Sequence, residues 1–240
     1  MSTFVLVHGS WHGGWCWHKI VARLERAGHR AHAPDLPGHG RDRRALAGIG
    51  LADYVRCVTD LLDREREPVI LVGHSRGGIV ISQVAEARPD KVRALVYLAA
   101  FLVPDSGTAL ELALADRDSL VMPNLEIDRT AGWDMLAERA YREALYADCA
   151  DDDIALARLL LTPEPSAPAA TPLRLSDENY GRVPRTYIEL TRDRAVSVTL
   201  QRRMMGGMPC REVRSLHTSH SAYFSAPDEL TEQLLAIRVS

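Results

Sequence analysis

Residues 68–78 read PVILVGHSRGG, so an apolar run leads directly into a Gly-x-Ser-x-Gly motif centred on Ser75. A serine on a sharp turn between a buried strand and a helix has a strained backbone, and side chains two residues away would collide there. Glycine at positions 73 and 77 removes those side chains. With the helix-patterned segment 77–88 behind it, the motif predicts that Ser75 is a catalytic nucleophile; the alternative is an ordinary glycine-rich connection.

Short apolar runs alternate with helix-length segments on both sides of this motif, which is typical of strand–helix–strand units. The predicted strands are residues 3–7, 30–33, 68–72, 92–98, 185–190 and 211–216. The predicted helices are residues 17–27, 51–65, 77–88, 196–205 and 227–237. This order predicts an α/β fold with a mostly parallel central sheet flanked by helices.

The segment 104–181 differs from the rest of the chain. Leu, Ala and acidic residues dominate it, its periodicity is helical, and a proline-rich stretch at 162–168 interrupts it. A chain of 240 residues with 46% hydrophobic residues is long enough for one domain with a sizeable core. We therefore expect a core domain formed by residues 1–103 and 182–240, with a helical cap inserted at 104–181.

Composition and charge limit the classes of partner and the cellular compartment that we expect. The net charge is −3 and no basic stripe stands out, which disfavours nucleic acid and anionic membranes and favours a small-molecule partner. The start of the chain lacks a signal peptide's features and no apolar run reaches about 18 residues, so we expect a cytoplasmic protein. All but two of the 29 basic residues are arginine, a bias typical of a GC-rich bacterial genome. The oligomeric state stays open, with a homodimer as one option.

Four cysteines, Cys16, Cys57, Cys149 and Cys210, are scattered without the spacing of a metal site. They suit free, packed thiols in a reducing compartment rather than a disulfide framework. We expect neither a metal nor another cofactor.

A serine hydroxyl is a weak nucleophile, so it needs a base to take its proton and a carboxylate to orient that base. In the chain order serine, acid, histidine, the base follows the last predicted strand, where only His217 and His220 lie. His220 is favoured because its loop can present the ring over the sheet edge. His217 directly follows the strand and is better placed as a local hydrogen-bond partner; the alternative for both is a solvated loop histidine.

The acid is expected after the strand at 185–190, because loops at the carboxyl ends of parallel strands gather an active site. Asp193 has this position, and its alternative role is a turn or capping carboxylate paired with Arg192 or Arg194. Asp105 is the second candidate. Glu189 lies within the strand and is expected to point to one face of the sheet.

The oxygen of a tetrahedral intermediate needs backbone N–H donors, one from the residue after the nucleophile and one from an early loop. Arg76 supplies the first candidate, and Ser10 in the loop HGSWHGGW at 8–15 supplies the second. The alternative for this glycine-rich loop is a phosphate cradle, but neither dinucleotide-binding nor P-loop spacing is present.

Several stretches together resemble the α/β-hydrolase superfamily, and more narrowly the plant methylesterase and hydroxynitrile lyase group. The resemblance covers nearly the whole chain and is carried by FVLVHG at 4–9, HGGW at 12–15, APDLPGHG at 33–40, VGHS at 72–75, REALYADC at 142–149, LLLTP at 159–163, the stretch 187–193 and His220. It implies a triad of Ser75, Asp193 and His220, an oxyanion hole from the Ser10 and Arg76 amides, and a buried pocket between cap and sheet for a small, fairly apolar ester.

Departures from that group are informative. The plant lyases use a lysine beside the catalytic histidine and a threonine in the first loop, where this chain has Ser221 and Gly9, so the lyase activity is disfavoured. Position 76 holds arginine where an uncharged residue is more usual; its guanidinium either points into the site or pairs at the surface. The expected pocket-lining residues are Trp11, His12, Phe101 and, from the cap, Trp133, Leu136 or Tyr146.

The leading hypothesis is therefore a serine hydrolase that cleaves a small carboxylic ester through an acyl-enzyme. A second hypothesis keeps the triad for a biosynthetic reaction on a specialised metabolite, such as lactone or thioester hydrolysis, cyclisation or elimination. A third is a receptor-like, ligand-binding module. A dehalogenase is disfavoured because its nucleophile is an aspartate and position 75 is serine.

Overall fold

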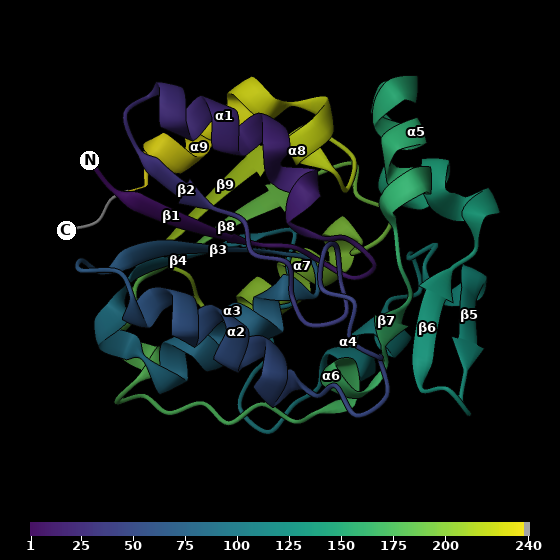
Figure 1. Cartoon of the computed structure of the whole chain (residues 1–240), viewed down its shortest axis with the longest axis horizontal. Helices are drawn as coiled ribbons and strands as arrows, with labels where there is room; N and C mark the ends of the chain where they lie inside the picture. Colours follow the sequence, from purple (N-terminus) through teal and green to yellow (C-terminus); the bar gives the residue numbers. More distant parts are fainter. Residues whose placement is uncertain (238–240) are drawn as a thin grey trace.

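The structure is a computed structural model that describes residues 1–237 (Figure 1). Over these residues six strands form one parallel sheet in the order β2-β1-β3-β4-β8-β9. Their bounds are β1 Thr3–Val7, β2 Arg30–His32, β3 Val69–His74, β4 Val92–Leu98, β8 Arg185–Leu190 and β9 Glu212–Leu216. The predicted parallel sheet is confirmed; residues 238–240 of the expected core segment lie outside the described residues.

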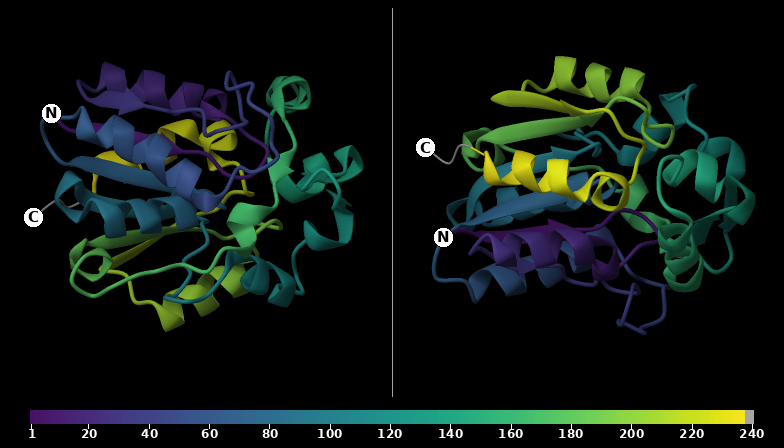
Figure 2. Two further views of the ribbon diagram at one scale, coloured as in Figure 1. Left: turned by 60° about the horizontal axis from the view of Figure 1, so that its bottom comes forward. Right: turned by 90° about the horizontal axis from the view of Figure 1, so that it is seen from above.

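Helices cover both faces of the sheet (Figures 1 and 2). On one face lie α1 His18–Arg26, α8 Ala222–Ser225 and α9 Pro227–Leu235, and on the other lie α2 Leu51–Asp63, α3 Gly77–Ala87 and α7 Val198–Gly207. Strand side chains alternate between faces, so Phe4 and Leu6 of β1 join the first layer whereas Val5 and Val7 join the second. Every residue of β3 is buried, which explains the unbroken apolar run at 69–72.

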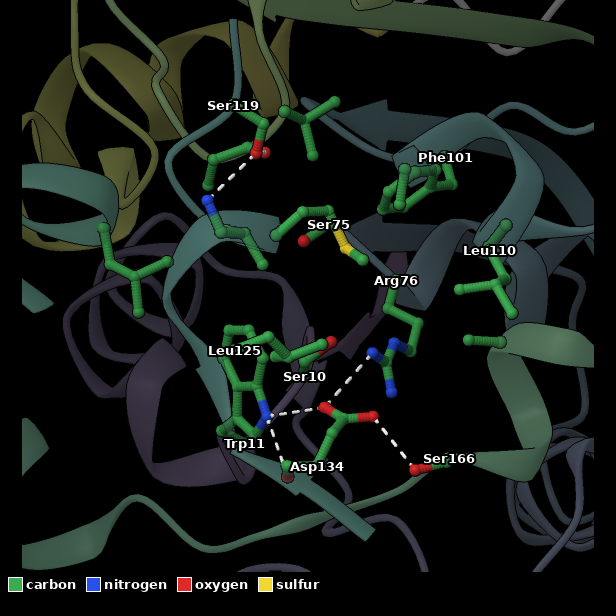
Figure 3. Close-up of a pocket in the computed structure, with 18 of the residues that line it drawn as sticks. Ser10, Trp11, Ser75, Arg76, Phe101, Leu110, Ser119, Leu125, Asp134 and Ser166 are labelled. Atoms are coloured by element: carbon green, nitrogen blue, oxygen red, sulfur yellow. Dashed lines mark hydrogen bonds and ion pairs between the residues drawn. The ribbon is translucent and has the colours of Figure 1, made fainter. Parts of the chain in front are cut away.

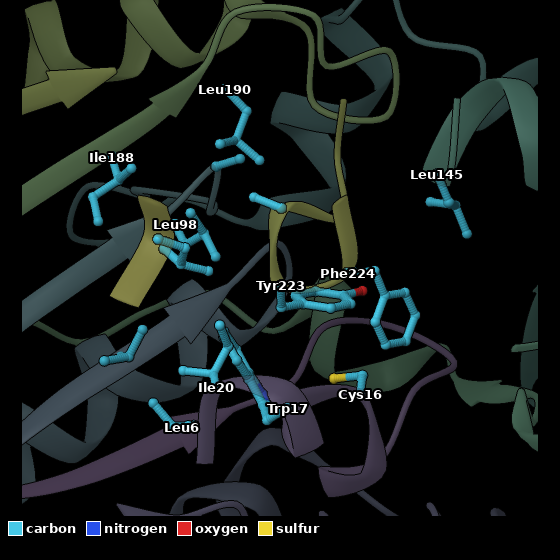
Figure 4. Packing of buried hydrophobic residues seen from close by; sticks show 14 of the residues in the cluster. Leu6, Cys16, Trp17, Ile20, Leu98, Leu145, Ile188, Leu190, Tyr223 and Phe224 are labelled. Atoms are coloured by element: carbon cyan, nitrogen blue, oxygen red, sulfur yellow. The ribbon is translucent and has the colours of Figure 1, made fainter. Parts of the chain in front are cut away.

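The first of these layers holds the segment after β9 in place (Figure 4). Trp17, next to α1, packs against the Tyr223 ring of α8 with 5.2 Å between ring centroids, and both side chains are fully buried. Leu6 of β1 and Leu98 of β4 belong to the same cluster. Burial of one such side chain contributes about 2 kcal/mol to the stability of the fold. This contact therefore fixes the chain directly after the loop that carries His220.

The segment 104–181 contains helices and, in addition, a small antiparallel sheet in the order β5-β6-β7. Its elements are α4 Ala109–Ala115, β5 Leu125–Asp128, β6 Trp133–Leu136, α5 Asp151–Leu160, β7 Glu164–Pro165 and α6 Ala167–Ala170. The segment contains helices, as expected, but the prediction of a helical segment did not include the small sheet. Apolar and acidic residues alternate in the LEID stretch of β5, and Gly132 with φ 73° closes the turn to β6.

Short turns of helix connect the larger elements. They are the 3₁₀ helices η1 Gly14–Trp17, η2 Pro89–Lys91, η3 Met122–Asn124, η4 Glu138–Ala140 and η6 Tyr180–Arg182, and the π-helix η5 Tyr141–Leu145. Among residues 1–237, no helix has the length and apolar character needed to cross a bilayer.

The parallel order brings the loops after β1, β3, β4, β8 and β9 to one edge of the sheet. The segment 104–181 lies at that edge (Figure 2). Five loops from distant parts of the sequence therefore meet beneath one inserted segment.

Candidate active site

Ser75 stands between β3 and α3 with φ 53°, a left-handed conformation that is strained for serine. A Cβ on Gly73 would lie 2.8 Å from the Gly77 carbonyl oxygen, and a Cβ on Gly77 would lie 2.8 Å from the His8 carbonyl oxygen. Both glycines are therefore required by close backbone approach. The predicted strand-to-helix turn is confirmed, and the role of Ser75 as nucleophile stays a prediction.

His220 and Asp193 lie together in the loops after β9 and β8. The Nδ1 atom of His220 is 2.7 Å from Asp193 Oδ2, and both side chains are almost fully buried. Asp193 Oδ1 accepts hydrogen bonds from the backbone N–H groups of Ala195 and Val196, at 2.7 and 3.0 Å. This arrangement places the Nδ1 proton between ring and carboxylate and leaves Nε2 as the proton acceptor.

The other candidates for base and acid lie elsewhere. His217 is exposed, and its Nδ1 pairs with the Thr191 hydroxyl at 2.9 Å. Asp105 is an exposed loop residue that accepts a hydrogen bond from the Leu175 N–H group. Glu189 lies within β8 and pairs with the Arg202 guanidinium of α7. The geometry thus favours Asp193 and His220 over these alternatives.

Two buried histidines hold the loop that carries Ser10. His8 Nδ1 lies 2.8 Å from the Gly9 carbonyl oxygen, while its Nε2 accepts the Leu36 N–H at 3.1 Å. These partners require a neutral ring with the proton on Nδ1. Burial, with His39 nearby, lowers the pKa of His8 to about 4. Because C=O and N–H point in opposite directions across a trans peptide, anchoring the Gly9 carbonyl also fixes the direction of the Ser10 N–H.

His12 repeats this arrangement one peptide further on. Its Nδ1 lies 2.7 Å from the Ser10 carbonyl oxygen, and its Nε2 lies 2.7 and 3.1 Å from the hydroxyls of Tyr146 and Tyr223. Burial lowers the pKa of His12 to about 3, so this ring is also neutral. His12 and Tyr146 were expected at the pocket wall; instead they lie behind the Ser10 loop and support it.

Ser75 and His220 line the same pocket, which has a volume of about 260 Å³ (Figure 3). Ser10, Arg76, Trp11 and Phe101 line it as well, as expected. Its remaining walls are mostly apolar and include Leu110, Val121, Met122, Leu125, Ile127 and Leu145.

Trp133 and Leu136 of β6 do not line this pocket. Side chains alternate along a strand, so Trp133 lies on the opposite face of β6 from Asp134, which does line it. Leu136 is buried in the hydrophobic core instead.

Comparison with known proteins agrees with this fold. Residues 4–233 match the alpha/beta hydrolase family. The chain belongs to this family. Methylesterase 7 of Arabidopsis thaliana is 34% identical over 98% of this chain and 96% of its own length. Putative methylesterase 11, chloroplastic, of the same plant is 37% identical over 98% of this chain, which spans only 64% of that relative.

Further relatives of this alpha/beta hydrolase include a bacterial enzyme and solved structures. The pyrethroid hydrolase of Sphingobium wenxiniae is 32% identical over 98% of this chain and 86% of its own length. The crystal structure of polyneuridine aldehyde esterase superposes with a TM-score of 0.90 at 27% identity, covering 98% of both chains. A methylesterase structure from Arabidopsis gives a TM-score of 0.87 at 27% identity over 98% of both chains.

In this alpha/beta hydrolase the side chain of Arg76 points into the site and does not pair at the surface (Figure 3). Its guanidinium lies 3.5 Å from Asp134 Oδ1 and 3.4 Å from Glu164 Oε1. Asp134 comes from β6 and also accepts the Trp11 indole N–H at 3.0 Å. Burial raises the pKa of Asp134, although Arg76 opposes that shift.

Glu164 of β7 is the centre of a polar cluster behind Trp11. Its carboxylate accepts hydrogen bonds from the Trp11 N–H at 3.0 Å and the Tyr54 hydroxyl at 2.8 Å, and pairs with His39 Nε2 at 2.9 Å. Burial alone would raise the pKa of Glu164, but His39 and Arg76 hold it well below its ordinary value. Burial likewise opposes a charged His39, whose pKa the Glu164 carboxylate nevertheless raises.

Sequence reasoning missed Asp134, Glu164 and His39 as neighbours of the site. Asp134 and Glu164 come from the small sheet that the helical expectation overlooked. The one available signal is an acidic residue, Glu164, alone within the proline-rich stretch 162–168.

Proposed function

We propose that this alpha/beta hydrolase is a serine hydrolase that cleaves a small carboxylic ester through an acyl-enzyme. The observation that carries the proposal is a buried Asp193–His220 pair, 2.7 Å apart, opening onto the same apolar pocket as a serine with φ 53°. The names of the relatives support it, since methylesterases, an esterase and a pyrethroid hydrolase share the fold over nearly the whole chain.

In the proposed reaction, Ser75 Oγ attacks the ester carbonyl carbon while His220 Nε2 takes the hydroxyl proton. Asp193 holds the ring and stabilises its charged form. The Ser10 and Arg76 N–H groups bind the oxyanion, and His220 then gives its proton to the departing alcohol. Water, activated by His220, hydrolyses the acyl-enzyme to release the acid and restore Ser75.

The inserted segment 104–181 is proposed as the cap of this site. It contributes pocket residues from α4, β5 and β6, among them Leu110, Ile127 and Asp134. A cap with apolar lining and a pocket of about 260 Å³ fits a small ester of apolar character. That the protein is cytoplasmic and that it comes from a bacterium remain predictions from the sequence.

The first test compares wild type with Ser75→Ala on short p-nitrophenyl esters and aromatic methyl esters. We expect the substitution to lower kcat by about 10⁴-fold or more, since removing a nucleophile removes the acyl-enzyme route. Ser106→Ala is the matched control, because Ser106 also has a left-handed backbone, φ 64°, but lies exposed in a loop. A fluorophosphonate adduct on Ser75, found by mass spectrometry, reports activation directly.

The outcomes separate the remaining functions. Undiminished turnover in Ser75→Ala would contradict the serine mechanism. An adduct without ester turnover would favour the biosynthetic alternative, in which the same triad serves a lactone, thioester, cyclisation or elimination. The absence of both adduct and turnover would favour a ligand-binding protein.

A further inference from the structure

The polar side chains of the pocket wall differ in how many of their hydrogen-bond donors already have acceptors within the protein. The Ser119 hydroxyl donates to the Ala195 carbonyl at 2.7 Å, and the Ser166 hydroxyl donates to Asp134 at 3.3 Å. Both hydroxyl hydrogens are therefore committed to acceptors within the protein. Arg76 is different, because a guanidinium carries five N–H donors in a fixed plane.

The N–H donors of Arg76 do not all have well-placed acceptors within the protein. Only 14% of its side chain is exposed, and its distances of 3.4 and 3.5 Å to Glu164 and Asp134 exceed those of ordinary N–H···O hydrogen bonds. Its Nη1 atom, which faces Glu164 Oε1 at 3.4 Å, is buried and forms no hydrogen bond of ordinary geometry within residues 1–237. A buried donor whose hydrogen bond is poorly formed loses stabilisation, so an acceptor placed in the pocket would gain from completing that bond.

The charges around Arg76 decide what kind of acceptor fits. Asp134 and Glu164 already place two carboxylates beside one guanidinium, with His39 on the far side of Glu164. A substrate carboxylate would bring a third negative charge into this buried corner, which is costly where charges are poorly solvated. A neutral oxygen accepts the same hydrogen bond without adding charge.

We propose that the Arg76 guanidinium is a specificity-determining donor to a second, neutral oxygen of the substrate: an ether, carbonyl or hydroxyl oxygen outside the scissile ester group. This inference rests on the proposed ester hydrolysis. Arg76 follows the nucleophile directly, and its side chain projects from the floor of the pocket beside Ser75 toward Asp134 (Figure 3). An ester with oxygen at the right distance is therefore preferred to its hydrocarbon isostere.

Matched ester pairs test this preference. In one arm, methyl 3-methoxypropanoate is compared with methyl pentanoate, so that the second oxygen lies in the acyl group. In the other arm, 2-methoxyethyl acetate is compared with butyl acetate, so that the second oxygen lies in the alcohol group. For each pair we divide kcat/KM for the oxygenated ester by kcat/KM for the hydrocarbon ester. We expect this ratio to be about tenfold higher in wild type than in Arg76→Leu in one of the two arms. Intrinsic reactivity cancels, because each pair is measured on both enzymes.

Two further comparisons keep the test decisive. Arg76→Lys retains a positive charge beside Asp134 and Glu164 but loses the planar set of donors, so its preference is expected to fall as well even if Arg76→Leu does not fold. The monoanion of monomethyl succinate tests the charge argument; it should be hydrolysed less well than methyl 3-methoxypropanoate. Equal ratios in wild type and both variants, or a preference for the monoanion, would overturn the proposal.

A binding measurement separates this inference from the proposed function. Ser75→Ala and Ser75→Ala/Arg76→Leu are compared by ligand-observed NMR with the same ester pairs, so no turnover is needed. A preference for the oxygenated ester that is lost with Arg76 supports the subsite even if wild type hydrolyses neither ester. Ser75-dependent hydrolysis without such a preference in either measurement rejects the subsite and leaves the esterase proposal standing.

Discussion

Gly9 lies against the proposed nucleophile, where a side chain has no room. A Cβ at position 9 would lie 2.8 Å from the Ser75 Cβ and 3.1 Å from His74 Nδ1, both of them in buried residues. We expect Gly9→Ala to lower kcat/KM by about 10²-fold, because a small displacement of a reacting group is enough for such a loss. Steady-state kinetics on the p-nitrophenyl esters measure it.

Gly206→Ala is the control for this substitution. Gly206 lies in α7, and a Cβ there would meet no atom within 4 Å. Alanine favours a helix over glycine by about 1 kcal/mol, so this variant should keep wild-type activity and unfold at an equal or higher temperature. Equal losses of activity in the two variants would contradict the contact argument.

Among single residues, the positions set by spacing within a short motif were predicted better than the positions set by contacts between distant parts of the chain. Gly-x-Ser-x-Gly placed Ser75 on its turn, because the constraint lies within five residues. Asp193 and His220 could be chosen because each follows a recognisable strand, and the structure brings them together. The wall of the pocket was predictable only in part: Trp11 and Phe101 line it, whereas His12 is turned away by a hydrogen bond to Tyr146, 134 residues further along the chain.

The loop between β1 and η1 depends on histidines that touch no substrate. His12→Phe keeps an aromatic ring but removes the donor to the Ser10 carbonyl and the acceptor for two tyrosine hydroxyls. With the Ser10 peptide less firmly held, we expect kcat to fall about 10- to 10²-fold while KM changes by no more than about twofold. Such a split between kcat and KM indicates a positioning residue.

His18→Phe serves as the control for His12→Phe. His18 Nδ1 also lies near a backbone carbonyl, that of Trp15, at 3.1 Å, but the side chain is exposed and the loop continues into α1. We expect unchanged kinetics for it. A parallel decrease in kcat in both variants would show that the His12 effect does not come from the Ser10 carbonyl.

Two buried carboxylates, Asp134 and Glu164, attach the small sheet of the proposed cap to the core. Glu164→Gln removes the charge that faces His39 and Arg76 while keeping the shape of the side chain. Breaking a buried pair leaves its partners uncompensated, so the free energy of unfolding should fall by about 3 kcal/mol in urea titrations. Glu138→Gln, at an exposed pair with Arg158, should lower it by less than about 0.5 kcal/mol, and similar values for the two would argue against the buried cluster.

Element prediction succeeded in the central sheet and failed in the small sheet of the segment 104–181. The strands at 92–98 and 185–190 have the bounds expected from their apolar runs. Strands β5, β6 and β7 span four, four and two residues, too few for a period of two to stand out within a leucine- and alanine-rich segment. Their pairing comes from contacts between distant residues such as Trp133 and Pro165.

At the scale of the whole molecule, three buried histidines couple folding to pH. Burial lowers the pKa of His8 to about 4, that of His12 to about 3, and that of His74 well below its ordinary value. In the unfolded chain these rings titrate near pH 6.5, so below that pH the unfolded chain binds protons that the folded protein excludes. Their contribution to stability is therefore complete above about pH 6.5 and is lost as the pH falls toward 4.

His39 contributes with the opposite sign in a different range. Although burial opposes its charged form, Glu164 raises its pKa above the unfolded value, so its contribution is complete below about pH 6.5 and is lost as the pH rises through the folded pKa. Below about pH 6.5 the ring is protonated in both states and adds no slope. The range from about pH 6.5 to pH 5 therefore reports on His8, His12 and His74 alone among these four histidines.

Urea titrations at several values between about pH 6.5 and pH 5 isolate that effect, because the range lies above the ordinary titration of carboxylates. Each excluded proton lowers the free energy of unfolding by up to about 1.4 kcal/mol per pH unit, so three histidines produce a slope of up to about 4 kcal/mol per pH unit. His12→Phe removes one of the three groups and should lower the slope by about a third. A free energy that stays constant over this range would mean that the buried rings take up protons in the folded state. For His8 this would break the hydrogen bond from the Leu36 N–H to Nε2, because a backbone N–H can only donate.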